Sequence, residues 1–348
     1  LLCGIYLFKV EFTFAIEQNC GIMKKIEFIK KDGLDNMIKI YEVIDKKLTS
    51  TDTIKIKSWI DLVNPKTSEI KEVVDKTGIN KEIIEKLLDE EELPRIEKRS
   101  EETVIILDTP HLVDNSLKHK YRTNPLGIII SEKGYLITVS LNEQPFLDYF
   151  RNTDIENFKG KNKSNFILQI FIMVAGIYQK ELSSINEYIN SKEKILLKST
   201  NNKELVNLLD IEKTLVYFIT SLNYNETALE KIAKGNIILL EKEEEELLTD
   251  ALIETKQAIE MASIYREILS STTDTYATII SNNLNDIMKF LAGITIVCSV
   301  PTMLASFIGM NVPLGIIGRS PFSFAMIIVI SVILSLIIAY ILRKKNLL

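Results

Sequence analysis

Two long uncharged runs at the C-terminus constrain this chain more than any other feature. Residues 290–318 carry no charged side chain, Arg319 interrupts, and residues 320–342 are again uncharged. Each run exceeds the roughly 20 apolar residues that cross the hydrocarbon core of a bilayer. The sequence therefore predicts two transmembrane helices, at 290–311 and 321–342, with an external loop at 312–320 and a basic tail at 343–348.

The rest of the chain has the composition of a water-soluble body. Hydrophobic residues make up 46% of the whole, charged residues 26%, and the net charge is −5. No basic stripe is present, so we expect no nucleic-acid partner. The cysteines and histidines are too few and too scattered for a disulfide framework, a zinc site or a nucleophilic triad. We therefore expect neither an enzyme nor a bound cofactor.

The first part of this body, residues 23–147, mixes strand and helix signals. Gly78 and Asn80 are a predicted helix stop and helix cap. They separate a helix that is capped by Thr67 or Ser68 and reaches Lys76 from a second helix at 81–91. Ser131 to Gly134 reads as a hairpin turn. Runs rich in β-branched residues predict strands at Lys25–Ile29, Ile54–Leu62, Thr103–Leu107, Leu126–Ile130 and Tyr135–Val139. This pattern predicts an α/β domain with a mixed sheet. Met23 looks like a natural start, so residues 1–22 are interpreted as a weakly ordered upstream extension.

Beyond Pro145 the pattern is helical. Apolar residues at three- and four-residue spacing predict helices at Asn165–Lys198, Asn202–Tyr224 and Glu226–Gly235, within a helical region at 148–235. Residues 236–292 contain no Gly or Pro, so a stalk helix at 236–289 should run unbroken into the first span, over about 110 Å. It carries a 3–4 seam that predicts packing against copies of itself, formed by Leu248, Leu252, Ile259, Ala262, Leu269, Tyr276, Ile280, Leu284 and Ile287.

One heptad stripe of the first span consists almost entirely of small or hydroxyl-bearing residues. Its members are Met288, Ala292, Thr295, Ser299, Thr302, Ser306 and Gly309. Such a stripe is typical of a helix–helix contact in lipid, or of a narrow wet pore on a symmetry axis. Asn285 lies one helical step before it. Met288 and Leu291 are interpreted either as core residues or as a hydrophobic constriction that gates by dewetting.

The tripeptide Gly309-Met310-Asn311 stands where a pore mouth would be, at the end of the first span. A small divalent cation loses its water reluctantly, so a mouth for such an ion should accept it hydrated, and amide oxygens can bind the water shell without trapping the ion. Gly309 should let the backbone turn out of the helix. The plainer alternative is a helix cap followed by a turn.

These residues resemble the CorA family of divalent-cation transporters, whose signature is Gly-Met-Asn after the first of two C-terminal membrane helices. Similar stretches are Asn285 to Leu291, Pro301-Thr302, Trp59-Ile60-Asp61-Leu62 and Pro94 to Glu97. The resemblance implies a homopentameric funnel made of an α/β cytoplasmic domain, a long helical stalk and two transmembrane helices. It also implies channel-like uptake of Mg²⁺, with Co²⁺ and Ni²⁺ as further ions, and closure by intracellular Mg²⁺ bound between protomers. Mg²⁺ is then both the transported and the regulatory ion.

The resemblance also implies a regulatory metal site. Asp250 matches its stalk-side acid, and Glu85-Lys86 stands where family members often carry an acidic pair. Lys86 puts that partner in question, so Glu85 or the Asp89–Glu92 cluster would substitute. That cluster and Glu243–Glu246 otherwise read as solvated helix ends. Asp274 lies on the stalk near the line of the pore stripe and completes the predicted set.

Flanking charges predict the orientation. Lys289 precedes the first span and three basic residues from Arg343 follow the second, so both termini should be cytoplasmic in a plasma membrane. Two alternatives remain open: a zinc transporter of the related ZntB type, and a non-conducting membrane-anchored scaffold.

Overall fold

The computed structural model describes residues 38–44, 47–99, 101–113, 120–152, 163–196, 202–235, 237–238, 240–310 and 322–345. The chain divides into two compact units. The first comprises Leu1–Lys194 and Asn202–Ser270, and the second comprises Ile195–Asn201 and Ser271–Leu348. The upstream extension, the strand expected at Lys25–Ile29 and Asn311 lie outside the described residues.

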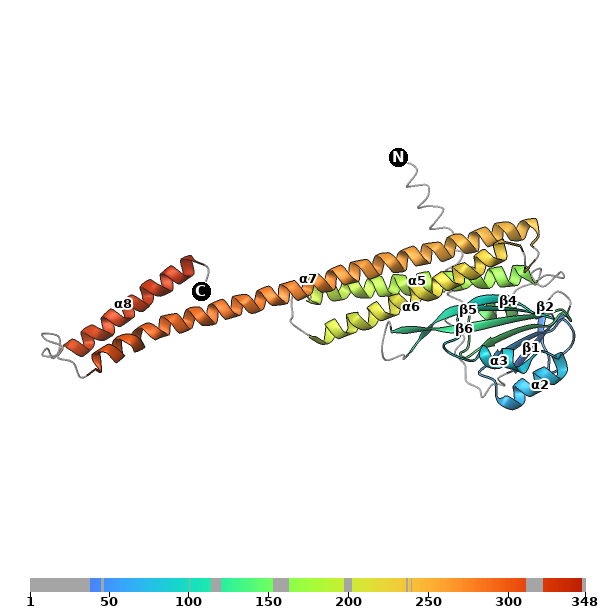
Figure 1. Ribbon diagram of the computed structural model, residues 1–348, viewed down its shortest axis with the longest axis horizontal. Helices are drawn as coiled ribbons and strands as arrows, with labels where there is room; N and C mark the ends of the chain where they lie inside the picture. The colour runs from blue at the N-terminus through green and yellow to red at the C-terminus, as the bar shows by residue number, and fades with distance from the viewer. Residues whose placement is uncertain are drawn as a thin grey trace, which may run out of the picture. The chain divides into compact units, whose positions relative to one another are not determined.

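A seven-stranded mixed sheet organises the first unit (Figure 1). Its order is β2-β1-β3-β7-β6-β5-β4, and only the β3–β7 pairing is parallel among the pairs described. The strands are β1 (Ile38–Ile44), β2 (Lys47–Ser50), β3 (Trp59–Val63), β4 (Arg95–Lys98), β5 (Glu102–Leu112), β6 (Tyr121–Ser131) and β7 (Leu136–Ser140). The predicted mixed sheet is confirmed. The sequence interpretation missed β1, β2 and β4, and it began β3 five residues early.

The turn between β6 and β7 is the predicted hairpin. The N–H of Gly134 donates to the carbonyl of Ser131 at 2.8 Å, and the φ of Gly134 is +97°. Glycine adopts this left-handed conformation without the penalty that a Cβ would bring. The local sequence thus fixes the register of the two strands.

Helices α2 (Thr67–Thr77) and α3 (Lys81–Lys86) cover one face of the sheet. Gly78, with φ of +79°, ends α2, and Asn80 caps α3 by accepting from the N–H of Glu82 at 2.9 Å. Two details differ from expectation. The N-cap of α2 is Lys66, whose backbone N–H donates to the Glu69 carboxylate, rather than Thr67 or Ser68. Helix α3 stops at Lys86, because tight turns follow it.

The opposite face carries Trp59 and receives the helical part of the unit. The helices are α4 (Leu147–Asn152), α5 (Ser164–Leu196), α6 (Asn202–Ala233) and α7 (Lys242–Ile308). Phe166 of α5 packs edge-on against Trp59, with ring centroids 5.4 Å apart. Helix α6 is a single helix where two were predicted, since Asn225 and Glu226 continue it without a break.

Helix α7 runs without interruption for 67 residues, which confirms the prediction that one helix continues past residue 290, although it begins at Lys242 and not at residue 236. In the first unit it lies beside α5 and α6 (Figure 1): Gln179 of α5 donates to the Glu254 carboxylate at 2.7 Å, and Lys256 faces Glu226 of α6 at 3.6 Å.

The stalk seam is a correction to the sequence interpretation. Leu248, Ala262 and Leu269 are buried inside this single chain, and Leu252 and Ile259 are half-buried. They were expected to pack against other helices, most simply other copies; Leu284 and Ile287 of the same seam are exposed, and for them the expectation stays a prediction. The seam residues satisfy the chain's own α5 and α6 first, because a 3–4 repeat does not specify whether the neighbouring helix belongs to the same chain. The large apolar side chains that α7 leaves exposed in the first unit are Ile253, Ile264 and Ile268.

The second unit contains the C-terminal part of α7 and α8 (Ser323–Lys344). Among the described residues, three helices are long and apolar enough to cross a membrane: Ser164–Lys192, Lys242–Ile308 and Phe324–Lys344. The most apolar window of the first is 50% buried inside the protein, against 6% for each of the others. A helix covered by its own sheet and helical neighbours has little surface for lipid, so α5 is best explained as a core helix.

Candidate functional site

The stripe that begins at Met288 lies fully on the exposed surface of α7. Met288 and Leu291 are 57% and 58% exposed, and Ala292, Thr295, Ser299, Thr302 and Ser306 are exposed as well. The other side of the helix is covered, with Gly293 buried and Val297, Val300, Leu304 and Ile308 half-buried. In the described part of one chain, the stripe is therefore an open surface and not an internal contact.

Helix α8, in the same unit, also has one covered side. Ser331 and Leu342 are buried, and Ile327, Ser335 and Ile338 are half-buried, at the three- and four-residue spacing of one helix face. The remaining side chains of α8 are mostly large, apolar and exposed, as expected for lipid contact. Small residues allow two helices to approach closely in lipid. The covered side of α7 lies opposite the predicted stripe, and the stripe residues stay exposed.

Three hydroxyl groups of the stripe are held by their own helix. Thr295 donates to the carbonyl of Leu291 at 2.8 Å, Ser299 to that of Ile296 at 2.8 Å, and Thr302 to that of Cys298 at 3.2 Å. Each hydroxyl proton is thereby used, and the oxygen lone pairs remain available. The stripe can consequently present oxygen acceptors to a hydrated cation.

The helix ends at Ile308, and Gly309 is exposed in the turn that follows. Its N–H still donates to the carbonyl of Ala305 at 2.9 Å, and its φ is not in the left-handed region. The helix thus ends where Gly309 was expected to let the backbone leave it, and the chain bends at Met310 without a left-handed conformation at the glycine. Met310 is 55% exposed, and Asn311 lies outside the described residues.

The predicted regulatory acids are not assembled within one chain. Glu85 pairs with Lys81 at 2.6 Å on the exposed face of α3, and Asp250 and Asp274 are exposed on α7. No group of three metal-ligating side chains lies together in the described residues. Asn285 is likewise exposed.

One of the acidic runs has a structural role that sequence reasoning missed. Glu244 is buried, its carboxylate accepts the backbone N–H of Glu241 at 2.8 Å, and the hydroxyl of Ser164 donates to the same carboxylate. These contacts cap α7 and attach its start to α5. Glu244 is therefore a capping residue, and the description of Glu243–Glu246 as a solvated face is wrong at this position. The sequence offered no clear signal for this role, because Glu241 stands where a capping box has Ser or Thr.

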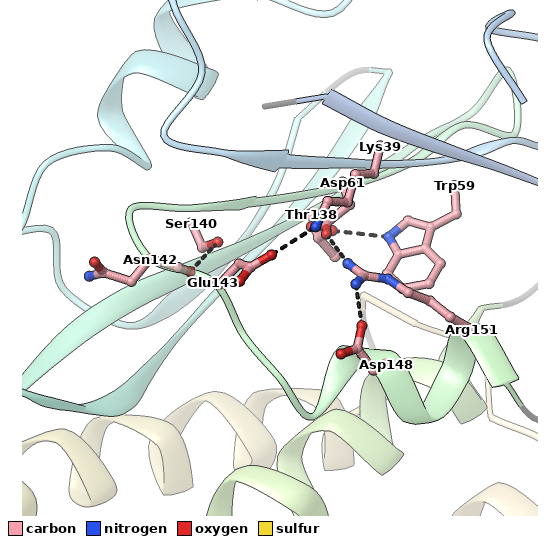
Figure 2. A network of polar contacts seen from close by, with 9 residues as sticks. All are labelled: Lys39, Trp59, Asp61, Thr138, Ser140, Asn142, Glu143, Asp148 and Arg151. Atoms are coloured by element: carbon pink, nitrogen blue, oxygen red, sulfur yellow. Dashed lines mark hydrogen bonds and ion pairs between the residues drawn. The ribbon is translucent and has the colours of Figure 1, made fainter. Parts of the chain in front are cut away.

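Figure 2 shows a second polar cluster, around the Trp-Ile-Asp-Leu strand. The Arg151 guanidinium on α4 bonds the Asp61 carboxylate at 2.5 Å and the Asp148 carboxylate, and lies 5.8 Å from the Trp59 ring centroid. Thr138 donates to Asp61 at 2.6 Å and accepts the Trp59 indole N–H at 3.0 Å. Burial raises the pKa of Asp61, and the Arg151 charge opposes this shift. The cluster fixes α4 to the sheet. Trp59 and Asp61 are two residues apart on β3, so their side chains lie on the same face of the sheet and both reach Arg151.

Comparison with known proteins shows the same architecture in transporters. Residues 56–344 match the family described as "CorA-like Mg2+ transporter protein". A cobalt/magnesium transport protein CorA of Methanocaldococcus jannaschii is 27% identical over 296 residues, which cover 83% of this chain and 90% of that protein.

Two solved structures share the fold. The complete CorA magnesium transporter of Methanocaldococcus jannaschii superposes with a TM-score of 0.78 at 23% identity, covering 91% of this chain and all of that one. The ZntB cytoplasmic domain of Vibrio parahaemolyticus has a TM-score of 0.57 at 15% identity, over 72% of this chain and all of that domain. Because the family match runs from just before β3 to the end of α8, the chain belongs to the CorA-like Mg²⁺ transporter family.

Proposed function

We propose that this protein is a homopentameric, channel-like uptake system for Mg²⁺ in the plasma membrane, with both termini in the cytoplasm. Co²⁺ and Ni²⁺ are the further ions that we expect it to carry. The observation that carries the proposal is the free stripe of α7: its oxygen-bearing side is exposed while its other side is covered. Five such stripes around one axis would form a narrow passage lined with hydroxyl groups.

The chemistry of the stripe suits a hydrated divalent cation. Magnesium keeps several waters, and hydroxyl and amide oxygens accept hydrogen bonds from that shell without the charge that would retain the ion. Gly309, Met310 and Asn311 would form the selectivity filter. Met288 and Leu291, exposed on the same side as the stripe, would form the constriction. A membrane potential supplies roughly 4.6 kcal/mol per divalent ion for each 100 mV.

Intracellular Mg²⁺ would close the channel by binding between protomers. Asp250 and Glu85 are exposed on the first unit, where a neighbouring copy could reach them, and Asp274 is exposed on α7. A cation shared by carboxylates of two subunits would hold them together, and its loss would leave like charges facing each other. The Lys81 side chain that pairs with Glu85 would have to release it for this role.

The test is a flux assay in liposomes with Mg²⁺, Co²⁺ and Zn²⁺ offered separately. We expect Mg²⁺ uptake by the wild type and its loss in Asn311→Ala, with five copies by mass measurement in detergent for both. Asn283→Ala, on the side of α7 away from the stripe, is the matched control and should transport normally. Zinc flux without Mg²⁺ flux would favour the ZntB-type alternative. No flux of any ion would favour the scaffold, and normal flux in Asn311→Ala would remove the filter assignment.

A further inference from the structure

The β5–β6 strand pair continues past the end of its sheet neighbour. Strand β4 makes its last pairing at Arg95 with Ile106, whereas β5 and β6 remain paired as far as Leu112 with Tyr121. We call this two-stranded extension, residues 107–112 and 121–126, the β5–β6 arm. Helix α6 lies against β5 and β6. The arm therefore links the sheet to the long helices.

A side chain of α6 replaces the missing strand at the base of the arm. The Asn225 amide oxygen accepts the backbone N–H of Asp108 at 2.9 Å, and the Asn225 amide nitrogen donates to the Asp108 carbonyl at 3.0 Å. Since β4 has ended two residues earlier, these backbone groups would otherwise be unpaired. The arm is thus docked on α6 by a contact that imitates a sheet pairing.

The Asp108 side chain lies in the same junction, and none of the described residues gives its carboxylate a cationic partner. Asp108 is 8% exposed, and its carboxylate receives one hydrogen bond, from the Ser221 hydroxyl on α6 at 2.5 Å. The Ser221 hydroxyl also lies 2.8 Å from that of Thr123 across the arm. Burial raises the pKa of Asp108 to about 6, and the Ser221 hydrogen bond opposes this shift. The charged carboxylate therefore opposes docking.

The titratable groups of the surrounding elements are engaged elsewhere. From α5, Tyr178 donates to the Asp108 backbone carbonyl at 3.3 Å, and Glu181 binds the hydroxyl of Tyr121. Charged groups of α6 pair with other residues: Asp210 binds Lys120 at 3.3 Å, and Glu226 binds Lys256. On the arm itself, His111 and Arg122 lie further along the strands than Asp108. A change in proton occupancy at this junction thus falls on Asp108.

We propose that Asp108, Ser221 and Asn225 form a proton-sensitive latch, in which protonation of the Asp108 carboxyl tightens the docking of the β5–β6 arm on α6. Protonation removes the buried charge and gives the carboxyl an O–H group that can donate a hydrogen bond. The ionised form keeps the backbone contacts to Asn225 but places an uncompensated charge between the arm and the helix. The docked arm is accordingly tighter in a more acidic cytoplasm.

The direction follows from the pKa shift. The docked carboxyl has a higher pKa than an open, hydrated one, so the stabilisation is fully present at low pH and is lost as pH rises through about 6. With values of 3.8 open and about 6 docked, the opening constant rises about tenfold between pH 5 and pH 7.5.

Hydrogen exchange of the full-length protein in detergent tests this latch. Peptides covering 107–112 and 121–126 are followed at pH 5 and pH 7.5, with rates corrected for the intrinsic pH dependence of exchange. We expect the arm of the wild type to lose about tenfold in protection at the higher pH. Asp108→Asn should show the same protection at both pH values, and more than the wild type at pH 7.5. Asp210→Asn, which alters the ion pair at Lys120 and leaves Asp108 in place, should keep the pH dependence.

A second variant covers the case in which Asp108→Asn folds poorly. Ser221→Ala removes the hydrogen bond that lowers the pKa of Asp108, so the midpoint of the protection change should move to higher pH. A wild-type arm whose corrected protection does not change between the two pH values overturns the proposal. A pH dependence that survives in Asp108→Asn, or a midpoint that stays in place in Ser221→Ala, overturns it equally.

Discussion

Replacing Arg151 by Met should destabilise the first unit more than any surface change, because it leaves a buried carboxylate without its cation. The Asp61 side chain is 1% exposed, and the Arg151 side chain that pairs with it is 16% exposed. Removing one partner of such a pair typically costs about 3–5 kcal/mol, since the remaining charge stays in a poorly solvated site. Met keeps most of the Arg side-chain volume, so the loss measures charge and hydrogen bonding rather than a cavity.

The assay uses the single tryptophan of the chain. Trp59 is 1% exposed and belongs to the same cluster, so its fluorescence follows unfolding where the change is made. Urea titrations should give a free energy of unfolding about 3–5 kcal/mol lower for Arg151→Met. Lys39→Met is the matched control. It breaks the Lys39–Glu143 pair, whose Glu143 side chain is 68% exposed, and should cost less than about 1 kcal/mol.

The pH dependence provides an internal check. Burial raises the pKa of Asp61, and loss of Arg151 removes the largest effect that opposes this rise. A raised carboxyl pKa means stability that is present at low pH and lost as pH rises, so the deficit of Arg151→Met should shrink on acidification. Adding Asp61→Asn should recover part of the loss, because no buried charge then remains. A variant that unfolds like Lys39→Met, or a deficit that is independent of pH, would refute the reasoning.

Two further predictions concern packing and regulation. A Cβ at Gly127 would lie 2.4 Å from the buried Leu87 side chain, so Gly127→Ala should lower the free energy of unfolding by about 1–3 kcal/mol. At Gly176 in α5 a Cβ meets open space, so Gly176→Ala should raise the free energy of unfolding by up to about 1 kcal/mol. Urea titrations that shift both variants in the same direction would count against this packing. Mg²⁺ should protect the wild-type stalk from proteolysis but not that of Asp250→Lys, and identical protection would exclude Asp250 as a sensor.

The sequence was most informative where local chemistry decides the structure. Gly78, Asn80 and Gly134 each impose a conformation or a hydrogen bond within a few residues, and all three lie where they were predicted. The long uncharged stretch and the lack of Gly or Pro before it predicted that α7 would run unbroken. These features need no knowledge of the rest of the fold.

The features that were missed depend on partners far away in the sequence. Strand β4 has three charged residues and one isoleucine at a sheet edge, and its pairing with β5 is what makes it a strand. Asp61 meets Arg151 ninety residues later, and no local pattern connects them. The part of the stalk seam from Leu248 to Leu269 was assigned to the wrong partner, since hydrophobic spacing predicts a neighbour without identifying it. Assembly of the regulatory acids depends similarly on surfaces that one chain does not contain.

The central claim is that the exposed stripe of α7 lines the ion path, and cysteine accessibility measures this most directly. In a background with Cys3, Cys20 and Cys298 changed to Ser, Thr302→Cys places a thiol on the stripe and Leu304→Cys places one on the covered side. Cd²⁺, a small thiol-binding cation, is added during Mg²⁺ flux in liposomes. We predict strong block of Thr302→Cys and unchanged flux in Leu304→Cys. Block of Leu304→Cys with no effect on Thr302→Cys would contradict the account.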